Sequence, residues 1–96
     1  MKPSQILARH RDEIVALTEK HKTANPRVFG SVARGEDTED SDLDLLVDSL
    51  PGTTLFNLIR LQLDLEGRLG LKVDVLTPEG LSKYIKASVL SEARLL

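Results

Sequence analysis

The sequence contains no cysteine, and this absence removes several kinds of chemistry at once. Disulfides, metal sites built on thiolates and cysteine nucleophiles are all excluded. Aromatic residues make up only 3% of the chain, with no tryptophan, one tyrosine and two phenylalanines. Platforms that bind single-stranded nucleic acid stack bases on aromatic side chains, so such a platform is not expected here.

Long hydrophobic runs are also missing. No stretch approaches the roughly 18 apolar residues of a membrane-spanning helix, and the N-terminal segment MKPSQILARHRDEIV carries charges throughout. It therefore lacks the continuous apolar region of a secretory signal. We expect a cytoplasmic protein with no membrane association. Its 96 residues fit one compact domain over residues 1–96, with little room for a second lobe around a large substrate.

The charges are unevenly distributed. The formal net charge is −2, from 13 basic and 15 acidic residues, but seven of the acids lie between Glu36 and Asp48, where there is no Lys or Arg. The rest of the chain carries a formal charge of +5 without an evident basic patch. Direct nucleic-acid binding is therefore not predicted. Of the seven acids, Glu36, Asp37, Glu39 and Asp40 are expected to form a solvated loop, with Asp48 a charge at a strand end.

The hydrophobic pattern predicts alternating helices and strands. Asn25-Pro26 and Gly70 mark breaks between them, and Thr77-Pro78 is typical of a helix start. By residue number, the expected order is helix 4–22, strand 27–30, a short helical turn from 31, strand 43–47, helix 55–69, strand 71–76 and a terminal helix from 78. This order predicts an α/β domain with a small mixed sheet of about three strands, packed with helices.

Helix 55–69 is apolar on more than one side. One predicted stripe faces the core and comprises Leu55, Leu58, Ile59, Gln62, Leu65 and Leu69. Leu61 and Leu63 lie beyond this stripe, and an apolar helix of this kind suggests a partner surface. Phe56 is expected in the core and Tyr84 in a packed position with its hydroxyl at the surface, whereas His21 is expected to be a surface residue.

Two aspartates interrupt the strand predicted at 43–47. Side chains alternate across a strand, so Asp42 and Asp44 point to one face while Leu43 and Leu45 point into the core. Neighbouring carboxylates repel one another unless a cation or solvent relieves the repulsion. A divalent cation is one explanation, and ligation by oxygen alone suits Mg²⁺ or Mn²⁺. A solvated strand face is the other.

A third aspartate follows the same logic. In LKVDVL, alternation buries Val73 and Val75 and turns Asp74 to the other face. A third carboxylate beside the pair would complete a ligand set for two metal ions, roughly 3.5–4 Å apart, of the kind used for displacement at phosphorus. Alternatively, Asp74 is an exposed residue that pairs with Lys72 on the same predicted face.

The segment GSVARG has the composition of an anion-binding turn. Gly30 allows close approach of a ligand to the backbone, and Ser31 offers a hydroxyl and N–H groups at the start of a short helix. Arg34, one helical turn later, reaches the same side. A phosphate-binding turn is one interpretation; an ordinary strand-to-helix corner is the other. The segment is neither a Walker A loop nor G-x-G-x-x-G.

Taken together, these elements resemble the nucleotidyltransferase superfamily signature, in which a Gly-Ser turn is followed by Asp-x-Asp. Gly30-Ser31, Arg34-Gly35 and Ser41-Asp42-Leu43-Asp44 provide the match, and Asp74 matches the third carboxylate of the superfamily. With its short length, the chain is similar to the minimal nucleotidyltransferase (MNT) branch over nearly its whole extent.

The resemblance implies roles for these residues. Asp42, Asp44 and Asp74 would be metal ligands for Mg²⁺, with two ions expected, or for Mn²⁺, and Asp74 could instead act as a base. Gly30 and Ser31 would contact the phosphates of ATP, and Arg34 would join them. In a site of this kind, metal ions and positioned donors stabilise the charge that develops on phosphoryl oxygens during transfer.

The resemblance also implies a partner. MNT proteins are similar to the antitoxins of toxin–antitoxin modules whose toxin is a HEPN-domain ribonuclease, and the family transfers AMP from ATP to a tyrosine of that toxin, a protein AMPylation. A hetero-oligomer with a HEPN protein is therefore expected. Two alternatives stay open: an inactive MNT fold that neutralises its partner by contact, and a small-molecule nucleotidyltransferase of the aminoglycoside type. The retained acids favour activity, because a binding module has no need of them.

Overall fold

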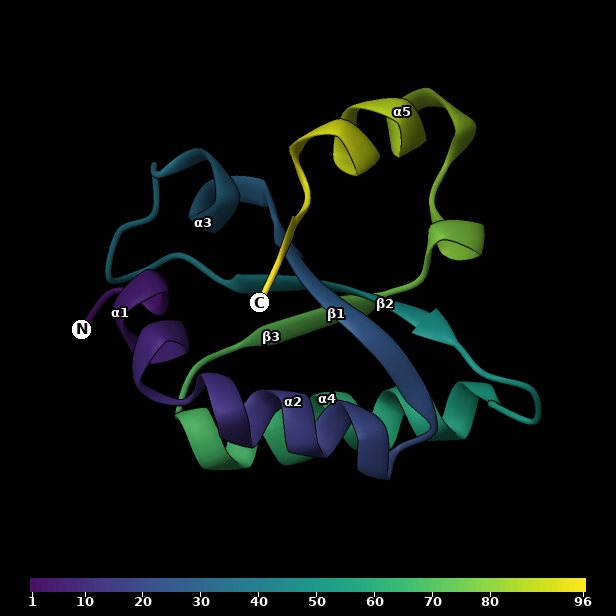
Figure 1. Cartoon of the computed structure of the whole chain (residues 1–96). Coiled ribbons are helices and arrows are strands. Elements are labelled where there is room, and N and C mark those ends of the chain that lie inside the picture. The colour runs from purple at the N-terminus through teal and green to yellow at the C-terminus, as the bar shows by residue number, and fades with distance from the viewer.

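The computed structural model describes residues 1–96 and confirms the α/β class, with a mixed sheet packed between helices (Figure 1). No helix is long and apolar enough to cross a membrane. The elements are α1 (Pro3–Arg9), α2 (Arg11–Lys20), β1 (Thr23–Phe29), α3 (Gly30–Arg34), β2 (Leu43–Ser49), α4 (Leu55–Leu69), β3 (Val73–Leu76), the 3₁₀ turn η1 (Pro78–Gly80), α5 (Lys83–Glu92) and β4 (Arg94–Leu95).

The sheet has four strands in the order β3-β2-β1-β4, one more than predicted. β1 runs antiparallel to both of its neighbours, whereas β2 and β3 are parallel. In the parallel pair Leu43 lies opposite Val73 and Asp44 opposite Asp74. This register brings together two positions that the sequence separates by 30 residues, because helix α4 makes the crossover between the two strands.

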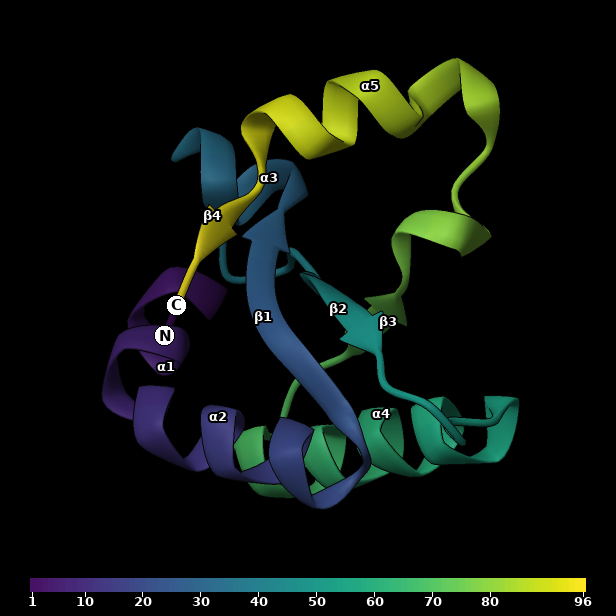
Figure 2. The ribbon, with the colours of Figure 1, turned by 45° about the vertical axis from the view of Figure 1, so that its right-hand side comes forward.

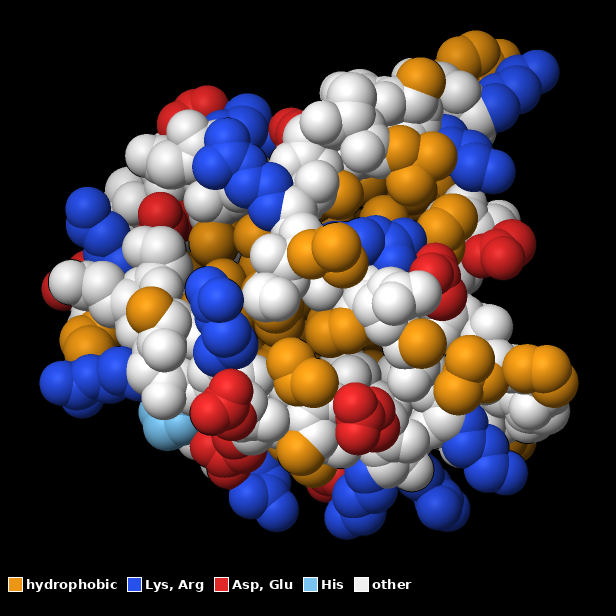
Figure 3. Space-filling model, viewed as in Figure 1, with side chains coloured by type: hydrophobic (Ala, Val, Ile, Leu, Met, Phe, Trp, Pro, Cys, Tyr) orange, Lys and Arg blue, Asp and Glu red, His pale blue; other side chains and the backbone are white.

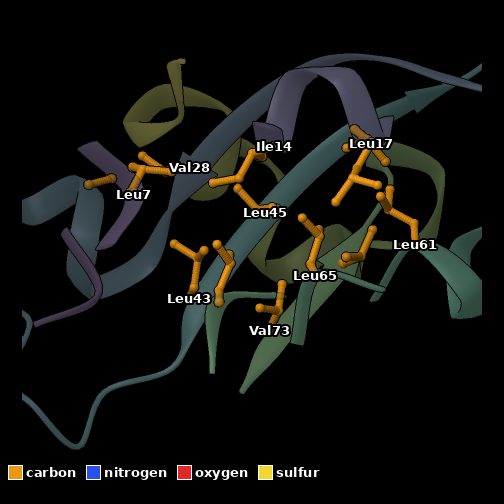
Figure 4. Close-up of a cluster of buried hydrophobic side chains, with 13 residues drawn as sticks. Leu7, Ile14, Leu17, Val28, Leu43, Leu45, Leu61, Leu65 and Val73 are labelled. Carbon is orange, nitrogen blue, oxygen red and sulfur yellow. The ribbon is translucent and has the colours of Figure 1, made fainter. Parts of the chain in front are cut away.

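Helices α1, α2 and α4 cover one face of the sheet and enclose the main hydrophobic core (Figures 1 and 4). Leu43 and Leu45 of β2 point into this core and are fully buried, as the predicted alternation requires. Figure 4 shows Leu45 between Ile14 of α2 and Leu65 of α4. The cluster comprises Leu7, Ile14, Leu17, Val28, Ala33, Leu43, Leu45, Val47, Leu61, Leu65, Leu69, Val73 and Val75.

The opposite face of the sheet is covered only in part. A small cluster of Phe29, Leu46, Leu81 and Val89 attaches η1 and α5 to it. Most other residues of α5 are exposed, and the helix stands away from the sheet in Figure 2. Hydrophobic side chains are visible below α5 in Figure 3. Asp44 and Asp74 belong to this face, because the residues that alternate with them, Leu43 and Val73 among others, point into the main core.

The N-terminal elements differ from the prediction at two points. The helix predicted over 4–22 is interrupted at His10, although no glycine or proline marks the break. β1 begins at Thr23 rather than 27, because Asn25 adopts a left-handed conformation (φ 53°) and the ladder to β2 shifts register between Ala24 and Arg27. The strand thus continues through Asn-Pro by means of a bulge.

The C-terminal helix is also divided. Thr77 caps only the 3₁₀ turn η1, and the chain extends through Leu81 before Ser82 caps α5. After α5 the chain becomes extended again at Ala93 and forms β4, whose end is fixed by the N–H of Leu96 donating to the carbonyl of Pro26. The predicted continuous helix therefore ends early and supplies the fourth strand.

The predicted core face of α4 is only partly correct. Leu61, Leu65 and Leu69 are buried against the sheet, whereas Leu55 and Ile59 are exposed and Phe56 is 74% exposed. The first turns of α4 extend past the sheet, so apolar residues there have no covering element. Two single-residue expectations were also wrong: Tyr84 is 85% exposed, and His21 is buried at the end of α2, where its Nε2 lies 2.7 Å from Oδ2 of Asp64.

Candidate active site

Asp44 and Asp74 form the centre of the candidate site. They lie opposite each other on neighbouring parallel strands, on the face that the main core does not occupy. Both side chains are half-buried. The structure thus brings together two of the three predicted carboxylates at the point where β2 and β3 begin.

The surroundings of Asp44 disfavour its charged form. Burial, followed by the negative charges of Asp74 and Asp42 and a shared hydrogen bond with Asp74, raises the pKa of Asp44 from 3.8 to about 6; Arg34 opposes this rise. A carboxylate in this state gains from a proton or from a cation. Because Arg34 offsets this rise only in part, the arrangement suits an added positive ion.

Asp42 lies at the edge of the pair. It is 42% exposed, and its Oδ2 is 3.8 Å from Nζ of Lys72. The alternative pairing of Lys72 with Asp74 is therefore not formed; the lysine contacts Asp42 instead. No three acidic or histidine side chains are gathered into a ready-made metal-binding group. The pair Asp44–Asp74 is formed in advance, whereas Asp42 would have to turn from Lys72 to join it.

The Gly-Ser turn lies directly against this pair. Gly30 follows Phe29, which is the register partner of Asp44, and adopts a left-handed conformation (φ +70°). A Cβ atom at Gly30 would collide with Oδ2 of Asp44. Only glycine both adopts this backbone angle without strain and leaves the space that Oδ2 of Asp44 occupies. Ser31, half-buried, comes next and begins the first turn of α3.

Arg34 ends α3 and is held by two acids. Its Nε donates to Glu36 at 3.1 Å, and its Nη1 donates to both oxygens of Glu92 at 3.2 and 3.3 Å. Hydrogen bonding to Glu92, more than any other cause, raises the pKa of Arg34 above its usual value. The guanidinium is close enough to lower the pKa of Asp44, so it belongs to the same electrostatic environment.

Two contacts of acidic side chains were missed by sequence reasoning. Asp37, expected in a solvated loop, is buried and its Oδ2 accepts from the N–H of Ser4 at 2.9 Å. Burial works to raise the pKa of Asp37, but the hydrogen bonds from Ser4 outweigh it and hold the pKa below its usual value. Glu92, at the end of α5, lies 62 residues from Gly30 in the sequence, and no local pattern connects the two.

The donor set fits the group that the resemblance implies. Around Gly30 the site offers carboxylate oxygens, a serine hydroxyl and a guanidinium, and no sulfur or imidazole. Oxygen ligands of this kind are those that Mg²⁺ and Mn²⁺ prefer. Burial and the negative charges of Asp74 and Asp42 together raise the pKa of Asp44, and this is the observation that favours such an ion.

This geometry, with paired carboxylates on adjacent strands and a Gly-Ser turn beside them, defines a nucleotidyltransferase fold and site. The sequence profile of the Nucleotidyltransferase domain family matches residues 10–96. A solved structure described provisionally as a minimal nucleotidyltransferase superposes with a TM-score of 0.86 at 46% identity, covering 97% of this chain and 95% of that one. The chain therefore belongs to the nucleotidyltransferase domain family, in the branch of minimal nucleotidyltransferases, and its enzyme class is that family's.

Similar proteins carry more specific names. The protein adenylyltransferase MntA of Thermococcus cleftensis is 41% identical over 87 residues, which is 91% of this chain and 85% of that protein. A Methanocaldococcus jannaschii protein, provisionally named a protein adenylyltransferase, is 41% identical over 81 residues, 84% of this chain and 87% of its own.

More distant solved structures share the fold alone. A toxin–antitoxin complex with AMP-PNP superposes with a TM-score of 0.75 at 21% identity, covering 88% of this chain and 69% of that one. The MntA–HepT toxin–antitoxin structure gives a TM-score of 0.69 at 18% identity, covering 92% and 69%.

Proposed function

We propose that this chain is a metal-dependent protein adenylyltransferase that moves AMP from ATP to a tyrosine of a HEPN-domain toxin and so acts as its antitoxin. The observation that supports this most directly is the Asp44–Asp74 pair beside the Gly30-Ser31 turn. The names of the relatives at 41% identity point to the same transfer, and the more distant toxin–antitoxin structures share its fold.

The roles of the residues follow from their positions. Gly30 lets the phosphates of ATP approach the turn closely, Ser31 binds them with its backbone N–H and hydroxyl, and Arg34 adds a charged donor. Asp42, Asp44 and Asp74 hold Mg²⁺ or Mn²⁺, with two ions in the complete site. When bound, these ions neutralise the triphosphate and polarise the α-phosphate.

The transfer balances as a displacement at phosphorus. The tyrosine oxygen forms a bond to the α-phosphorus of ATP, the bond between the α-phosphorus and the bridging oxygen breaks, and pyrophosphate leaves with that oxygen. The proton of the tyrosine hydroxyl passes to a carboxylate of the pair, where Asp74 can accept it.

The acceptor must come from another protein or another molecule. The first turns of α4 expose Leu55, Phe56, Ile59 and Leu63. Contact of this apolar surface with water is unfavourable, and such surfaces commonly mark protein–protein interfaces. Beside it lies a shallow apolar pocket of about 340 Å³, lined by Leu55, Leu58, Ile59, Gln62, Val75, Leu76, Thr77 and Gly80. These features support a hetero-oligomer with the partner protein.

A transfer assay tests the proposal. Native protein, Asp44→Asn and Asp48→Asn are each incubated with α-labelled ATP, Mg²⁺ and a purified candidate HEPN-domain toxin. Asp48 is the matched control because it lies on the same face of β2 outside the site. We expect label on the HEPN protein with the native chain and with Asp48→Asn, and none with Asp44→Asn.

Neutralisation of the toxin is measured in the same mixtures. If Asp44→Asn neutralises the HEPN ribonuclease as well as the native chain does, the protein acts by contact and the enzymatic proposal is wrong. Label on an aminoglycoside in place of the protein would move the assignment to a small-molecule nucleotidyltransferase.

A further inference from the structure

Glu92 connects the C-terminal segment to the Gly-Ser turn. Its Oε1 accepts from the N–H of Gly30 at 2.9 Å, and both of its oxygens accept from Nη1 of Arg34. Gly30 is the first residue of α3 and Arg34 the last. One carboxylate thus holds both ends of this helix, and Ser31 lies between them.

The direction of the Gly30 N–H shows what this contact does. Alternate residues of a strand direct their backbone groups to the same neighbour, and the carbonyl of Pro26 accepts from Leu96 on the β4 side. The N–H of Gly30 faces that same side, whereas Asp44 lies opposite Phe29 on the β2 side. Glu92 therefore continues the β1–β4 ladder with its side chain and does not enter the space between Gly30 and the carboxylate pair.

A five-residue helix needs such a support. The hydrogen bonds within one turn do not offset the cost of ordering it, so packing and capping set its orientation. Hydrogen bonds from Gly30 and then from Arg34 hold the pKa of Glu92 below its usual value, so the carboxylate is charged when it makes these contacts. The contacts leave Nη2 of Arg34 without an internal partner and therefore free for a ligand.

We propose that Glu92 is a positioning residue of the nucleotide site, which holds Gly30 and Arg34 so that Ser31 and the free Nη2 face the triphosphate. This inference rests on the proposed function, because it assigns to Glu92 the orientation of the phosphate-binding groups. It also makes the end of α5 and the start of β4 part of the site, although no sequence motif of the family includes them here.

Two variants separate the contacts of Glu92. Glu92→Gln keeps an oxygen for the N–H of Gly30 but removes the charge that holds Arg34, and Glu92→Ala removes both. Glu36→Gln is the matched control, because Glu36 is the other carboxylate on Arg34 and does not contact Gly30. Binding of ATP with Mg²⁺ is measured by calorimetry on the full chain, and KM and kcat are measured in the transfer assay.

We expect Glu92→Ala to weaken ATP binding about tenfold or more, as is usual when a hydrogen-bonded charge is lost. Glu92→Gln should weaken it less, and Glu36→Gln should match the native chain. KM for ATP should rise in both Glu92 variants with kcat near native. In a double-mutant cycle, adding Glu92→Gln to Arg34→Gln should cause little further loss, because Glu92 acts largely through Arg34.

Three results would overturn part of this account in different ways. Native affinity in both Glu92 variants would show that the residue is only structural. Tighter ATP binding by Glu92→Gln would show that the carboxylate competes with the phosphates instead of orienting their ligands. Absence of ATP binding by the native chain would contradict the proposed function itself, and the inference with it.

Discussion

Asp44 and Asp48 lie four residues apart on the same face of β2, but their surroundings are opposite. Hydrogen bonds from Asn25 and then from Arg27 hold the pKa of Asp48 below its usual value. At the other end of the strand, burial and the charges of Asp74 and Asp42 raise the pKa of Asp44. Asp48 therefore has hydrogen-bond donors as its neighbours, whereas the nearest charged neighbours of Asp44 include two other carboxylates.

This difference distinguishes a structural acid from the acid that we propose to be functional. Both residues belong to the same acidic stretch and the same alternating pattern, so the pattern alone does not separate them. The separation comes from the neighbouring strands: β1 offers Arg27 to Asp48, and β3 offers Asp74 to Asp44. A fold gains nothing from keeping two carboxylates opposite each other, so the pair indicates a ligand that relieves their repulsion.

The largest expected effect is on catalysis. Asp74→Asn should reduce AMP transfer by on the order of a thousandfold, because it removes the proposed metal ligand and proton acceptor from the reacting centre. Asp48→Asn, which changes an acid of the same stretch outside the site, should keep activity close to native. Rates of label transfer from ATP measure both. Equal loss in the two variants would show that the two ends of β2 do not differ as described.

The next effect concerns the turn beside Asp44. Gly30→Ala should destabilise the chain by about 2 kcal/mol or more and abolish ATP binding, because the new Cβ meets Asp44 in a strained backbone conformation.

Gly35→Ala is the matched control, since Gly35 has nearly the same conformation (φ +72°) but open space around its Cβ position. It should cost only about 1 kcal/mol and leave ATP binding intact. Chemical denaturation and calorimetry compare the two. Similar ATP affinities in both variants would mean that contact with Asp44 does not matter.

The raised pKa of Asp44 predicts a pH dependence of stability. The folded chain binds a proton at Asp44 more tightly than the unfolded chain does, so without metal the contribution of Asp44 to stability should fall as pH rises from 3.8 through about 6, against the opposite trend from acids whose pKa is lowered, such as Asp48 and Glu92. Because Asp44 is only half-buried, solvent screening reduces the effect to on the order of 1 kcal/mol.

Denaturation in EDTA at several pH values measures this fall. Asp44→Asn should remove it, and Mg²⁺ should reduce it in the native chain above pH 6 by supplying the missing positive charge. If the free energy of unfolding changed with pH in the same way in the native chain and in Asp44→Asn, the unfavourable surroundings that we assign to the charged form of Asp44 would be contradicted.

The smallest effect is expected at the structural end of β2. Asp48→Asn should lower the free energy of unfolding by less than about 1 kcal/mol, since its pairing with Arg27 is partly exposed. Asp44→Asn should leave the metal-free chain at neutral pH as stable as the native one or more so, because it removes a repulsion. Parallel urea titrations decide whether the two substitutions differ in sign.

Local patterns predicted much of this fold. The alternation in LDLLV placed Leu43 and Leu45 in the core, and Gly70 ends α4 in a left-handed conformation as a terminating glycine should. These features depend on neighbours in the sequence. The class of protein followed from Gly30-Ser31 and the spaced aspartates for the same reason, and the family match confirms it.

Features that depend on distant contacts could not be predicted in this way. β4 forms because β1 presents a free edge to residues 94 and 95, and Glu92 joins the turn only after α5 has packed against Phe29 and Leu46. Asp37 looks like any other acid of its loop until Ser4 meets it. The apolar face of α4 was misread in part: the predicted stripe included Leu55, which is exposed, and left out Leu61, which is buried, because only the extent of the sheet decides which of these residues is covered.

Binding of Mn²⁺ in the presence of ATP tests the central claim most directly. Electron paramagnetic resonance of Mn²⁺ distinguishes bound from free ion without requiring turnover or a partner protein. The native chain and Asp48→Asn should bind Mn²⁺ together with ATP. With Asp44→Asn, the bound fraction of Mn²⁺ should not exceed the fraction that ATP binds in the absence of protein. Binding by Asp44→Asn equal to that of the native chain would show that the Asp44–Asp74 pair is not the metal site.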